Sequence, residues 1–297
     1  MLKRSVVQFV LIFYAVIVIY PLFWVVSSSL RQTADINEHP WALPASPRWE
    51  NYSKAWQGDQ TSGDAGLAVA FVNSAVVTTV SLGLILLFGS MAAYVLARYV
   101  FAGSSLIYKV FLFGMMFPVF LGIIPLYLML NGMGTGLESI HTSLLGSVGG
   151  SWALVGSLHG LIIVYVAYSL SFTIFVLTGF FKTLPGELAE AGAIDGCSHW
   201  GIFWKIMLPL AKPGLITAGI FNAIGLWNEY PLALVLTQEN TRTLPIAIAD
   251  LAQKQHYQTD QGALFAGIVI VIVPTLIGYV FFQRRITAGL TAGAVKG

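Results

Sequence analysis

Residue types that usually carry catalysis or bind metals are sparse in this chain of 297 residues. The single cysteine, Cys197, and the histidines His141, His159, His199 and His256 show no metal-ligand spacing. The sequence also lacks H-E-x-x-H, G-x-S-x-G and the phosphate-binding motif G-x-x-x-x-G-K-S/T. We therefore expect no catalytic residue, no metal site and no cofactor bound by this chain.

Two segments nevertheless group polar residues in a way that could bind another molecule. Trp227, Asn228 and Glu229 are consecutive, and Asn222 precedes them by little more than one helical turn. These four residues, called the polar cluster below, offer an indole ring, two amides and a carboxylate. The second segment, residues 182–212, contains both acidic and basic residues within a largely apolar neighbourhood.

The composition indicates which elements must position these segments. Apolar residues make up 57% of the chain and charged residues only 9%, with a mean hydropathy of +0.78. Soluble domains carry about 25% charged residues, so this chain lacks the charge needed to cover a water-exposed surface. A formal net charge of only +2 gives no basic patch for nucleic acid. Soluble enzymes, nucleic-acid binders and disordered proteins are thereby excluded, and a membrane-embedded protein remains.

Six segments are apolar enough to cross a bilayer, which takes about 20 residues per helix. They are residues 6–26, 69–96, 110–130, 158–181, 213–236 and 263–282. The first could be a cleaved signal peptide because Lys3 and Arg4 precede it, but its apolar stretch is long and no A-x-A-like site follows. The pattern predicts an all-α polytopic membrane protein with six transmembrane helices.

The lysines and arginines indicate the orientation, because these residues prefer short cytoplasmic loops. With both termini cytoplasmic, ten of the fifteen basic residues lie on the inner side: Lys3, Arg4, Arg98, Lys109, Lys182, Lys205, Lys212, Arg284, Arg285 and Lys296. Between the spans, residues 131–157 are rich in glycine, and we expect them to be partly irregular.

The inner segment 182–212 is predicted to form two short helices around a sharp turn. Pro185 suits a first helical turn, and Glu190 places negative charge near the positive end of that helix. Asp195-Gly196 should end it, because glycine adopts positive φ cheaply. A second helix is expected to begin around Ser198. The first helix should carry a narrow apolar stripe made of Leu188, Ala191 and Ile194.

This segment, called the coupling hairpin below, resembles the EAA loop of ABC-importer permeases, which docks into a groove on a cytoplasmic ATPase. The resemblance rests on Glu190-Ala191, Asp195-Gly196 and Ile206-Met207-Leu208-Pro209. It departs from the family at Gly192, where alanine is usual, and glycine there should loosen the helix by about 0.5–1 kcal/mol. The resemblance implies ATPase coupling through Glu190, Ala191, Gly192, Asp195, Gly196, Ile206, Leu208 and Pro209.

Other segments resemble the carbohydrate-importer branch, and within it the smaller permease subunit of maltose-type systems. They are Asn73-Ser74, residues 92–98, residues 124–127, Trp227-Asn228-Glu229 and the tail 289–297. The resemblance implies a type I ABC-importer permease fold, and a tail whose Gly293, Val295, Lys296 and Gly297 reach the ATPase dimer interface. It also implies a second homologous permease, two copies of an ABC ATPase that carry ATP and Mg, an extracytoplasmic sugar-binding protein, and a bacterial or archaeal plasma membrane.

The polar cluster has three interpretations at this stage. Polar groups at membrane depth are costly and usually face a bundle interior or a water-filled cavity, so the cluster could line a sugar pathway. It could equally lie near the outer interface, or pack against a partner helix. On the family resemblance we divide the chain into residues 1–67, an anchor helix with an outer loop, and residues 68–297, the core permease domain that contains the coupling hairpin.

A stand-alone secondary transporter is the alternative function. Such a protein would show internal repeats and titratable residues within its spans. The sequence has no clear repeat, and Glu229 is the one acid within a predicted span.

Overall fold

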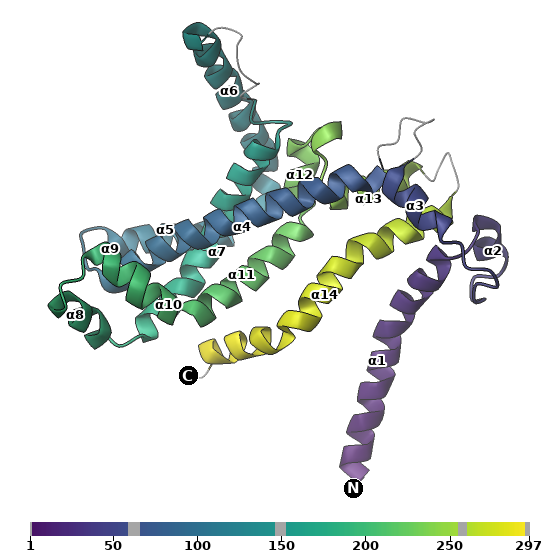
Figure 1. The fold of residues 1–297 in the computed structure, drawn as a ribbon, viewed down its shortest axis with the longest axis horizontal. Helices are drawn as coiled ribbons and strands as arrows, with labels where there is room; N and C mark the ends of the chain where they lie inside the picture. Colours follow the sequence, from purple (N-terminus) through teal and green to yellow (C-terminus); the bar gives the residue numbers. More distant parts are fainter. Residues whose placement is uncertain (1, 59–65, 146–152, 255–259, 295–297) are drawn as a thin grey trace. The chain divides into compact units, whose positions relative to one another are not determined.

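The computed structural model describes residues 2–58, 66–145, 153–254 and 260–294 (Figure 1), and every regular element within these ranges is helical. The elements in chain order are α1 (Leu2–Ser29), α2 (Thr33–Glu38), α3 (Glu50–Gln57), α4 (Gly66–Arg98), α5 (Ser104–Met116), α6 (Val119–Leu145), α7 (Leu158–Thr183), α8 (Glu187–Ile194), α9 (His199–Ile202), a π-helical segment (Phe203–Met207), α10 (Leu208–Leu210), α11 (Lys212–Trp227), α12 (Pro231–Leu236), a 3₁₀ turn (Glu239–Thr241), α13 (Leu244–Lys254) and α14 (Gln261–Ala294). The all-α prediction is confirmed.

Five of the described helices are long and apolar enough to cross a membrane: Arg4–Ser29, Gly66–Arg98, Val119–Gly136, Leu158–Thr183 and Gln261–Gln283. A sixth is obtained if His199–Leu210 and Lys212–Trp227, which meet at an angle of 72°, count as one bent span. The described helices thus supply five spans, or the six predicted from the sequence if the bent pair counts as one, and two of the predicted spans differ in bounds and shape.

The third predicted span, residues 110–130, is wrong as a single helix. α5 ends at Met116, and α6 begins at Val119. Phe117 between them has an extended backbone (φ −72°, ψ 125°), because the ring of Pro118 disfavours helical angles in the residue before it. In the segment 131–157, expected to be partly irregular, α6 continues to Leu145, and the described residues 153–157 have no regular structure. Its glycines lower helix propensity by about 1 kcal/mol each without forbidding a helix.

The fifth predicted span, residues 213–236, is interrupted as well. α11 ends at Trp227, and a separate short helix, α12, starts at Pro231. Proline is well placed as the first residue of α12, because the N–H that it lacks has no partner within a helix at that position.

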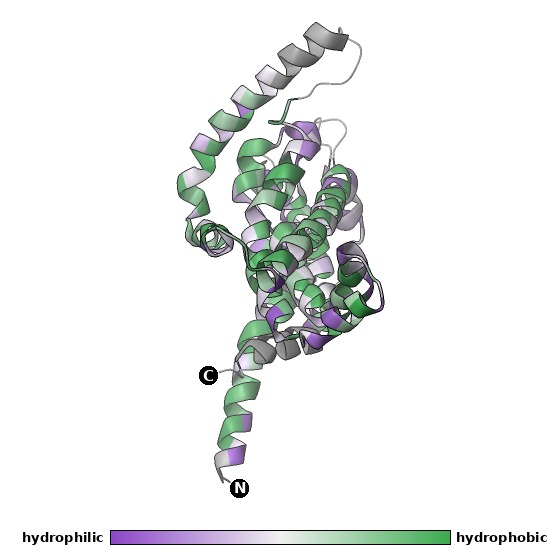
Figure 2. Cartoon of the chain, turned by 90° about the vertical axis from the view of Figure 1, so that its left-hand side faces the viewer, coloured by the Kyte–Doolittle hydropathy of each residue, from purple (hydrophilic) through white to green (hydrophobic). Residues whose placement is uncertain are grey.

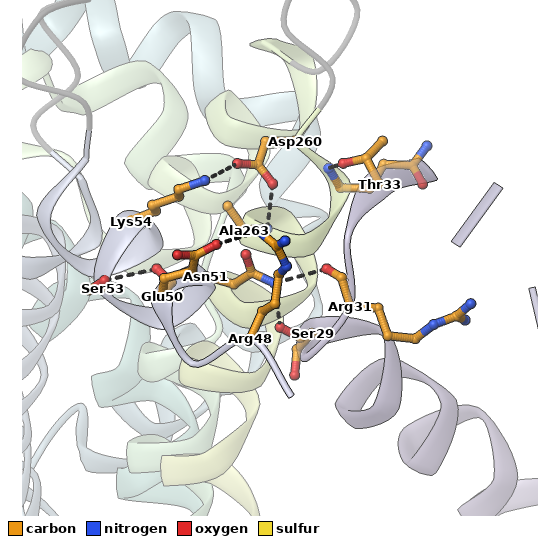
Figure 3. Close-up of polar contacts among 11 residues, drawn as sticks. Ser29, Arg31, Thr33, Arg48, Glu50, Asn51, Ser53, Lys54, Asp260 and Ala263 are labelled. Atoms are coloured by element: carbon orange, nitrogen blue, oxygen red, sulfur yellow. Dashed lines mark hydrogen bonds and ion pairs between the residues drawn. The ribbon is translucent and has the colours of Figure 1, made fainter. Parts of the chain in front are cut away.

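One compact unit of the chain comprises residues 1–72 and 243–276. Here the polypeptide after α1 is held against the start of α14 (Figure 3). The amide of the buried Asn51 donates to the backbone oxygens of Ser29, at 2.9 Å, and Arg31, at 3.0 Å. The Lys54 ammonium lies 3.2 Å from the Asp260 carboxylate, whose other oxygen caps the first turn of α14. The segment after α1 is thus a folded structure within this unit.

α1 contrasts with this polar structure. Hydrophobic residues follow one another along the helix (Figure 2), and none of its most apolar window is buried within the chain. A fully apolar surface of this kind is stable only when lipid or another protein covers it. α1 is therefore a membrane helix that gains little stability from packing inside its own chain.

The second compact unit comprises residues 73–242 and 277–297. In it α5 and α11 both pack against α7. The contacts are close where glycine faces a side chain: a Cβ added at Gly89 lies 2.6 Å from Thr173, and one at Gly214 lies 2.5 Å from Phe180. Small residues allow membrane helices to approach closely, which strengthens van der Waals packing. α7 is thus the central helix of this unit.

The close approach at the start of α14 gives a test of the first unit. A Cβ at Gly262 lies 2.5 Å from the backbone oxygen of Arg31 and 2.6 Å from the amide nitrogen of Asn51. Gly262→Ala should therefore destabilise the protein by about 1–3 kcal/mol, the usual cost of overpacking. The matched control is Gly278→Ala in the same helix, where nothing lies within 4 Å of the added Cβ.

The measurement is the fraction of detergent-solubilised protein that stays folded and monodisperse after stepwise heating. We expect a lower midpoint for Gly262→Ala alone. Equal midpoints for the two variants would contradict the described packing between the outer segment and α14.

Candidate functional site

The coupling hairpin has the predicted form of two helices around a sharp turn. Gly196 ends α8 with φ +79°, and its N–H donates to the oxygen of Ala193 at 3.0 Å. The N–H of Cys197 donates to the oxygen of Gly192 at 2.9 Å, which completes a Schellman motif. Ser198 then starts α9, where its hydroxyl oxygen accepts a hydrogen bond from the N–H three residues on.

The second half of the hairpin belongs to the core of its unit. Ile202, Phe203 and Met207 are buried together with Tyr94 of α4 and Phe181 of α7. The rings of Tyr94 and Phe203 lie 5.2 Å apart, and those of Tyr94 and Phe181 lie 5.5 Å apart. The hairpin is therefore attached to two long helices through a buried aromatic contact.

Two further contacts fix the hairpin at the end of α4. The Arg98 guanidinium donates to the backbone oxygen of Leu184 at 2.6 Å, and the Tyr99 hydroxyl lies 3.0 Å from the Nδ1 atom of His199. The end of α4 is thus bonded to the chain on both sides of α8.

The first half of the hairpin faces outward. Figure 1 shows α8 at the periphery of its unit, beside α9. Glu190, Ala191 and Asp195 are exposed, and 86% of Ile194 and 39% of Leu188 are accessible. The apolar stripe predicted from the sequence therefore lies on the accessible face of α8, next to exposed carboxylates. Such a surface has the chemistry of a protein contact, with apolar residues flanked by charge.

Gly192 faces inward, and this changes the interpretation of its identity. A Cβ at this position lies 2.5 Å from Cδ1 of Ile206 and 3.4 Å from Cγ1 of Ile202. The absent side chain lets α8 lie directly against the second half of the hairpin. The cost in helix propensity expected from the sequence is accompanied by a gain in close packing that the sequence did not reveal.

The other predicted coupling residues differ in exposure. Ile206 and Leu208 are half-buried against the aromatic core, whereas Pro209 is exposed. Gly293 lies in the last turn of α14, and Val295, Lys296 and Gly297 lie outside the described residues. The accessible surface of the hairpin therefore includes α8 and, in the second half, the exposed side chains of Trp200 and Trp204.

The polar cluster at the break between α11 and α12 is organised around Glu229. One carboxylate oxygen accepts a hydrogen bond from the N–H of Leu232 at 2.8 Å. The other accepts from the N–H of Ala233 at 3.0 Å and from the hydroxyl of Tyr165 at 2.7 Å. Glu229 thus satisfies backbone donors at the start of α12, and the buried Tyr165 ties it to α7.

Asn222 forms a second connection between α11 and α7. Its buried amide donates to Oγ1 of Thr173 at 2.8 Å and to the oxygen of Ala218 at 2.9 Å. Asn228 has a local role, because its amide donates to the oxygen of Ile224 at 2.8 Å, at the end of α11. The carboxylate and one amide of the cluster therefore act between helices, and the other amide acts within one.

A cavity of about 480 Å³ opens beside these contacts, and we call it the α7–α11 cavity. Asn222 and Glu229 line it, whereas Trp227 and Asn228 do not. The other lining residues are Met115, Val119, Tyr168, Ser169, Phe172, Phe221, Gly225, Leu226, Pro231 and Leu232. A mostly apolar, aromatic-lined hollow with a few polar groups is the usual form of a small-molecule site.

The residues that α7 contributes were missed in the sequence, although a signal was present. Tyr165, Tyr168, Ser169 and Phe172 are spaced i, i+3, i+4 and i+7, so they share one face of the helix. The hydroxyl-bearing side chains in this set could have indicated a polar face inside an apolar span. That they meet the polar cluster follows only from the packing of α7 on α11.

Comparison with known proteins adds an independent finding. The family of binding-protein-dependent transport system inner membrane components matches residues 85–287. A permease protein of a diacetylchitobiose uptake system from Streptomyces coelicolor is 42% identical over 96% of this chain and 87% of its own. A trehalose transport system permease protein from Mycobacterium tuberculosis is 32% identical over 93% of this chain and 92% of its own.

A solved bacterial alginate ABC transporter, in complex with an alginate pentasaccharide-bound periplasmic protein, has a chain of the same fold. The TM-score is 0.61 with 13% identity, over 96% of this chain and 95% of that one. The family match covers most of the chain, and the relatives match along nearly its full length. The chain therefore belongs to the family of binding-protein-dependent transport system inner membrane components, the permeases of ABC importers.

Proposed function

We propose that this chain is one of two permease subunits in an ATP-driven importer for a sugar or oligosaccharide, and that it forms half of the translocation pathway. The observation that carries this proposal is the coupling hairpin, which combines an exposed α8 with a second half buried in the helix core. Relatives named for diacetylchitobiose and trehalose transport support the sugar class. Diacetylchitobiose is the first substrate to test, because the relative named for it shares 42% of its residues with this chain.

The hairpin is suited to transmit force. A partner that holds α8 acts on the second half of the hairpin through the Gly192 contact, and the π-helical segment acts on α4 and α7 through the buried cluster of Phe203 with Tyr94 and Phe181. Close-packed interiors transmit displacement because they compress little. Movement imposed on α8 by an ATPase is thereby passed to α7, which borders the α7–α11 cavity.

The family to which the chain belongs supports the remaining parts of the proposed importer. Two ABC ATPase subunits bind ATP and Mg, a second permease completes the pathway, and an extracytoplasmic sugar-binding protein delivers the substrate. Both termini lie in the cytoplasm of a bacterial or archaeal cell, and the tail residues Gly293, Val295, Lys296 and Gly297 reach the ATPase dimer. The exposed Glu190 is placed to pair with an arginine of the ATPase, since charge-assisted hydrogen bonds are the stronger kind.

The α7–α11 cavity is the proposed sugar path through this subunit. Its amide and carboxylate can bond hydroxyl groups, and its aromatic rings can cover the apolar face of a sugar. The proposal therefore rests on Asn222 and Glu229 within the polar cluster. Asn228 bonds the backbone within the last turns of α11, and neither it nor Trp227 lines the cavity.

A first prediction concerns the turn of the coupling hairpin. Gly196→Pro removes the N–H that bonds Ala193 and is incompatible with φ +79°, so α8 loses its orientation. Glu190→Lys reverses the charge at the docking surface and keeps the fold. Both variants should lower ATPase co-purification and sugar uptake by at least about tenfold, which corresponds to about 1.4 kcal/mol of interaction.

The control for the hairpin is Gly186→Ala, which lies before α8 with φ −66° and has open space for a Cβ. It should leave assembly and uptake unchanged at matched expression. Normal assembly and uptake in both Gly196→Pro and Glu190→Lys would contradict the coupling role.

A second prediction concerns the cavity. Tyr168→Ala removes an aromatic ring that lines it, and should lower uptake roughly tenfold at low sugar concentration, because burial of such a ring contributes about 1.5–3 kcal/mol. ATPase co-purification should not change, because Tyr168 is not among the described residues that form the buried core of the hairpin. Phe175→Ala is the matched control, since Phe175 is an exposed aromatic residue on the same helix outside the cavity lining.

The measurement is initial uptake rate against sugar concentration in proteoliposomes that contain the whole importer. A higher KM for Tyr168→Ala than for Phe175→Ala is the expected result. Identical kinetics for the two variants would show that the cavity does not contact sugar.

A further inference from the structure

The charge around the α7–α11 cavity is of one sign. Among the twelve lining residues in the described part of the chain Glu229 is acidic, and none is lysine, arginine or histidine. The remaining polar lining groups, which belong to Asn222, Ser169 and Tyr168, are uncharged. A molecule inside the cavity therefore meets a carboxylate without meeting a basic side chain of this subunit.

The carboxylate is held in place at the cavity wall. The groups that bond Glu229 are two backbone N–H groups, of Leu232 and Ala233, and the Tyr165 hydroxyl, and all three act as donors. Three donors facing one carboxyl group match an ionised carboxylate, which is an acceptor only. They spread its negative charge without cancelling it, because none of them is a cation. The position of this charge is fixed by α12 and α7 together.

We propose that Glu229 makes this subunit select uncharged saccharides and reject acidic ones such as uronic acid sugars. The proposal rests on the sugar path proposed above, and it assigns to that path a substrate class. Repulsion between like charges is strengthened where water is partly excluded, as in a cavity walled by Phe172, Phe221 and Leu226. The expected discrimination by this subunit is about tenfold or more against one carboxylate on the sugar.

Gly225 provides a way to change the charge without disturbing Glu229. It lines the cavity from α11, and nothing lies within 4 Å of a Cβ added there. Gly225→Lys thus places a positive charge beside the carboxylate while all three hydrogen bonds of Glu229 remain. Glu229→Gln removes the negative charge directly, and the two variants reach the same electrostatic change by different routes.

The experiment uses the complete importer in proteoliposomes and two probes of nearly equal size. One probe is diacetylchitobiose, and the other is the same disaccharide with one primary hydroxyl oxidised to a carboxylate. Trehalose and maltose with their oxidised counterparts serve in the same way. We measure the uptake of the acidic probe divided by that of the uncharged probe, first in a variant and then in the wild type. The first value divided by the second is the double ratio. Preferences of the binding protein cancel in this double ratio, because the binding protein is the same throughout.

We expect the double ratio to rise about tenfold for Gly225→Lys and for Glu229→Gln. Gly225→Ala, which adds a Cβ without charge, should leave the double ratio near one. Gly179→Lys should do so too, because Gly179 has open space for a Cβ but lies outside the cavity lining.

The outcomes separate the two proposals. If the wild type takes up these sugars but the double ratio for Gly225→Lys is near one, the proposed selection by charge is wrong. The proposed sugar path is not affected by that result. An equal rise for Gly179→Lys also overturns it, because the effect is then one of overall charge. If the wild-type importer takes up none of these sugars, acidic or uncharged, the proposed function itself fails.

Discussion

Inside a bilayer a helix can be interrupted only where other groups take over its backbone hydrogen bonds, because no water is available to do so. This constraint governs the second compact unit. At the break between α11 and α12, the Glu229 carboxylate accepts from two N–H groups at the start of α12. The Asn228 amide donates to a carbonyl group near the end of α11. The polar cluster exists because the chain turns here, and its side chains complete the bonds that the turn leaves open.

The hydrogen bonds that stabilise this break also place polar side chains beside the α7–α11 cavity. The Glu229 carboxylate at this break also has a partner across the helix interface, the hydroxyl of Tyr165 in α7. Asn222, earlier in α11, makes a second hydrogen bond across the same interface, to Thr173 of α7. Two contacts that hold α11 on α7 therefore border a hollow lined by aromatic rings. The side chains that hold these helices together are thus the same ones that are proposed to bind the sugar. Polar residues within membrane helices are costly, so few are present to fill both roles.

Much of this could be predicted from sequence because membrane helices obey strong compositional rules. The apolar runs placed α1, α4, α7 and α14 correctly, and Gly196 with its neighbours was sufficient to define the hairpin turn. Some features were not predicted from the sequence, either for a local backbone reason or because they depend on contacts with other helices. Pro118 breaks an apolar run that hydropathy reads as continuous, since hydropathy is insensitive to backbone angles. Gly192 and Tyr165 owe their roles to contacts with other helices, and a single sequence carries no signal for which helices pack together.

The order in which these hydrogen-bond partners occur in the sequence has a consequence for the synthesis and membrane insertion of the chain. Tyr165 and Thr173 precede their partners, Glu229 and Asn222, by about fifty to sixty residues of the sequence. At a synthesis rate of about 5–20 residues per second, α7 leaves the ribosome several seconds before α11 does. When the polar end of α11 enters the membrane, the groups that it must bond are already there. The hydrogen-bond partners of Asn222 and Glu229 are thus synthesised before these two polar residues are.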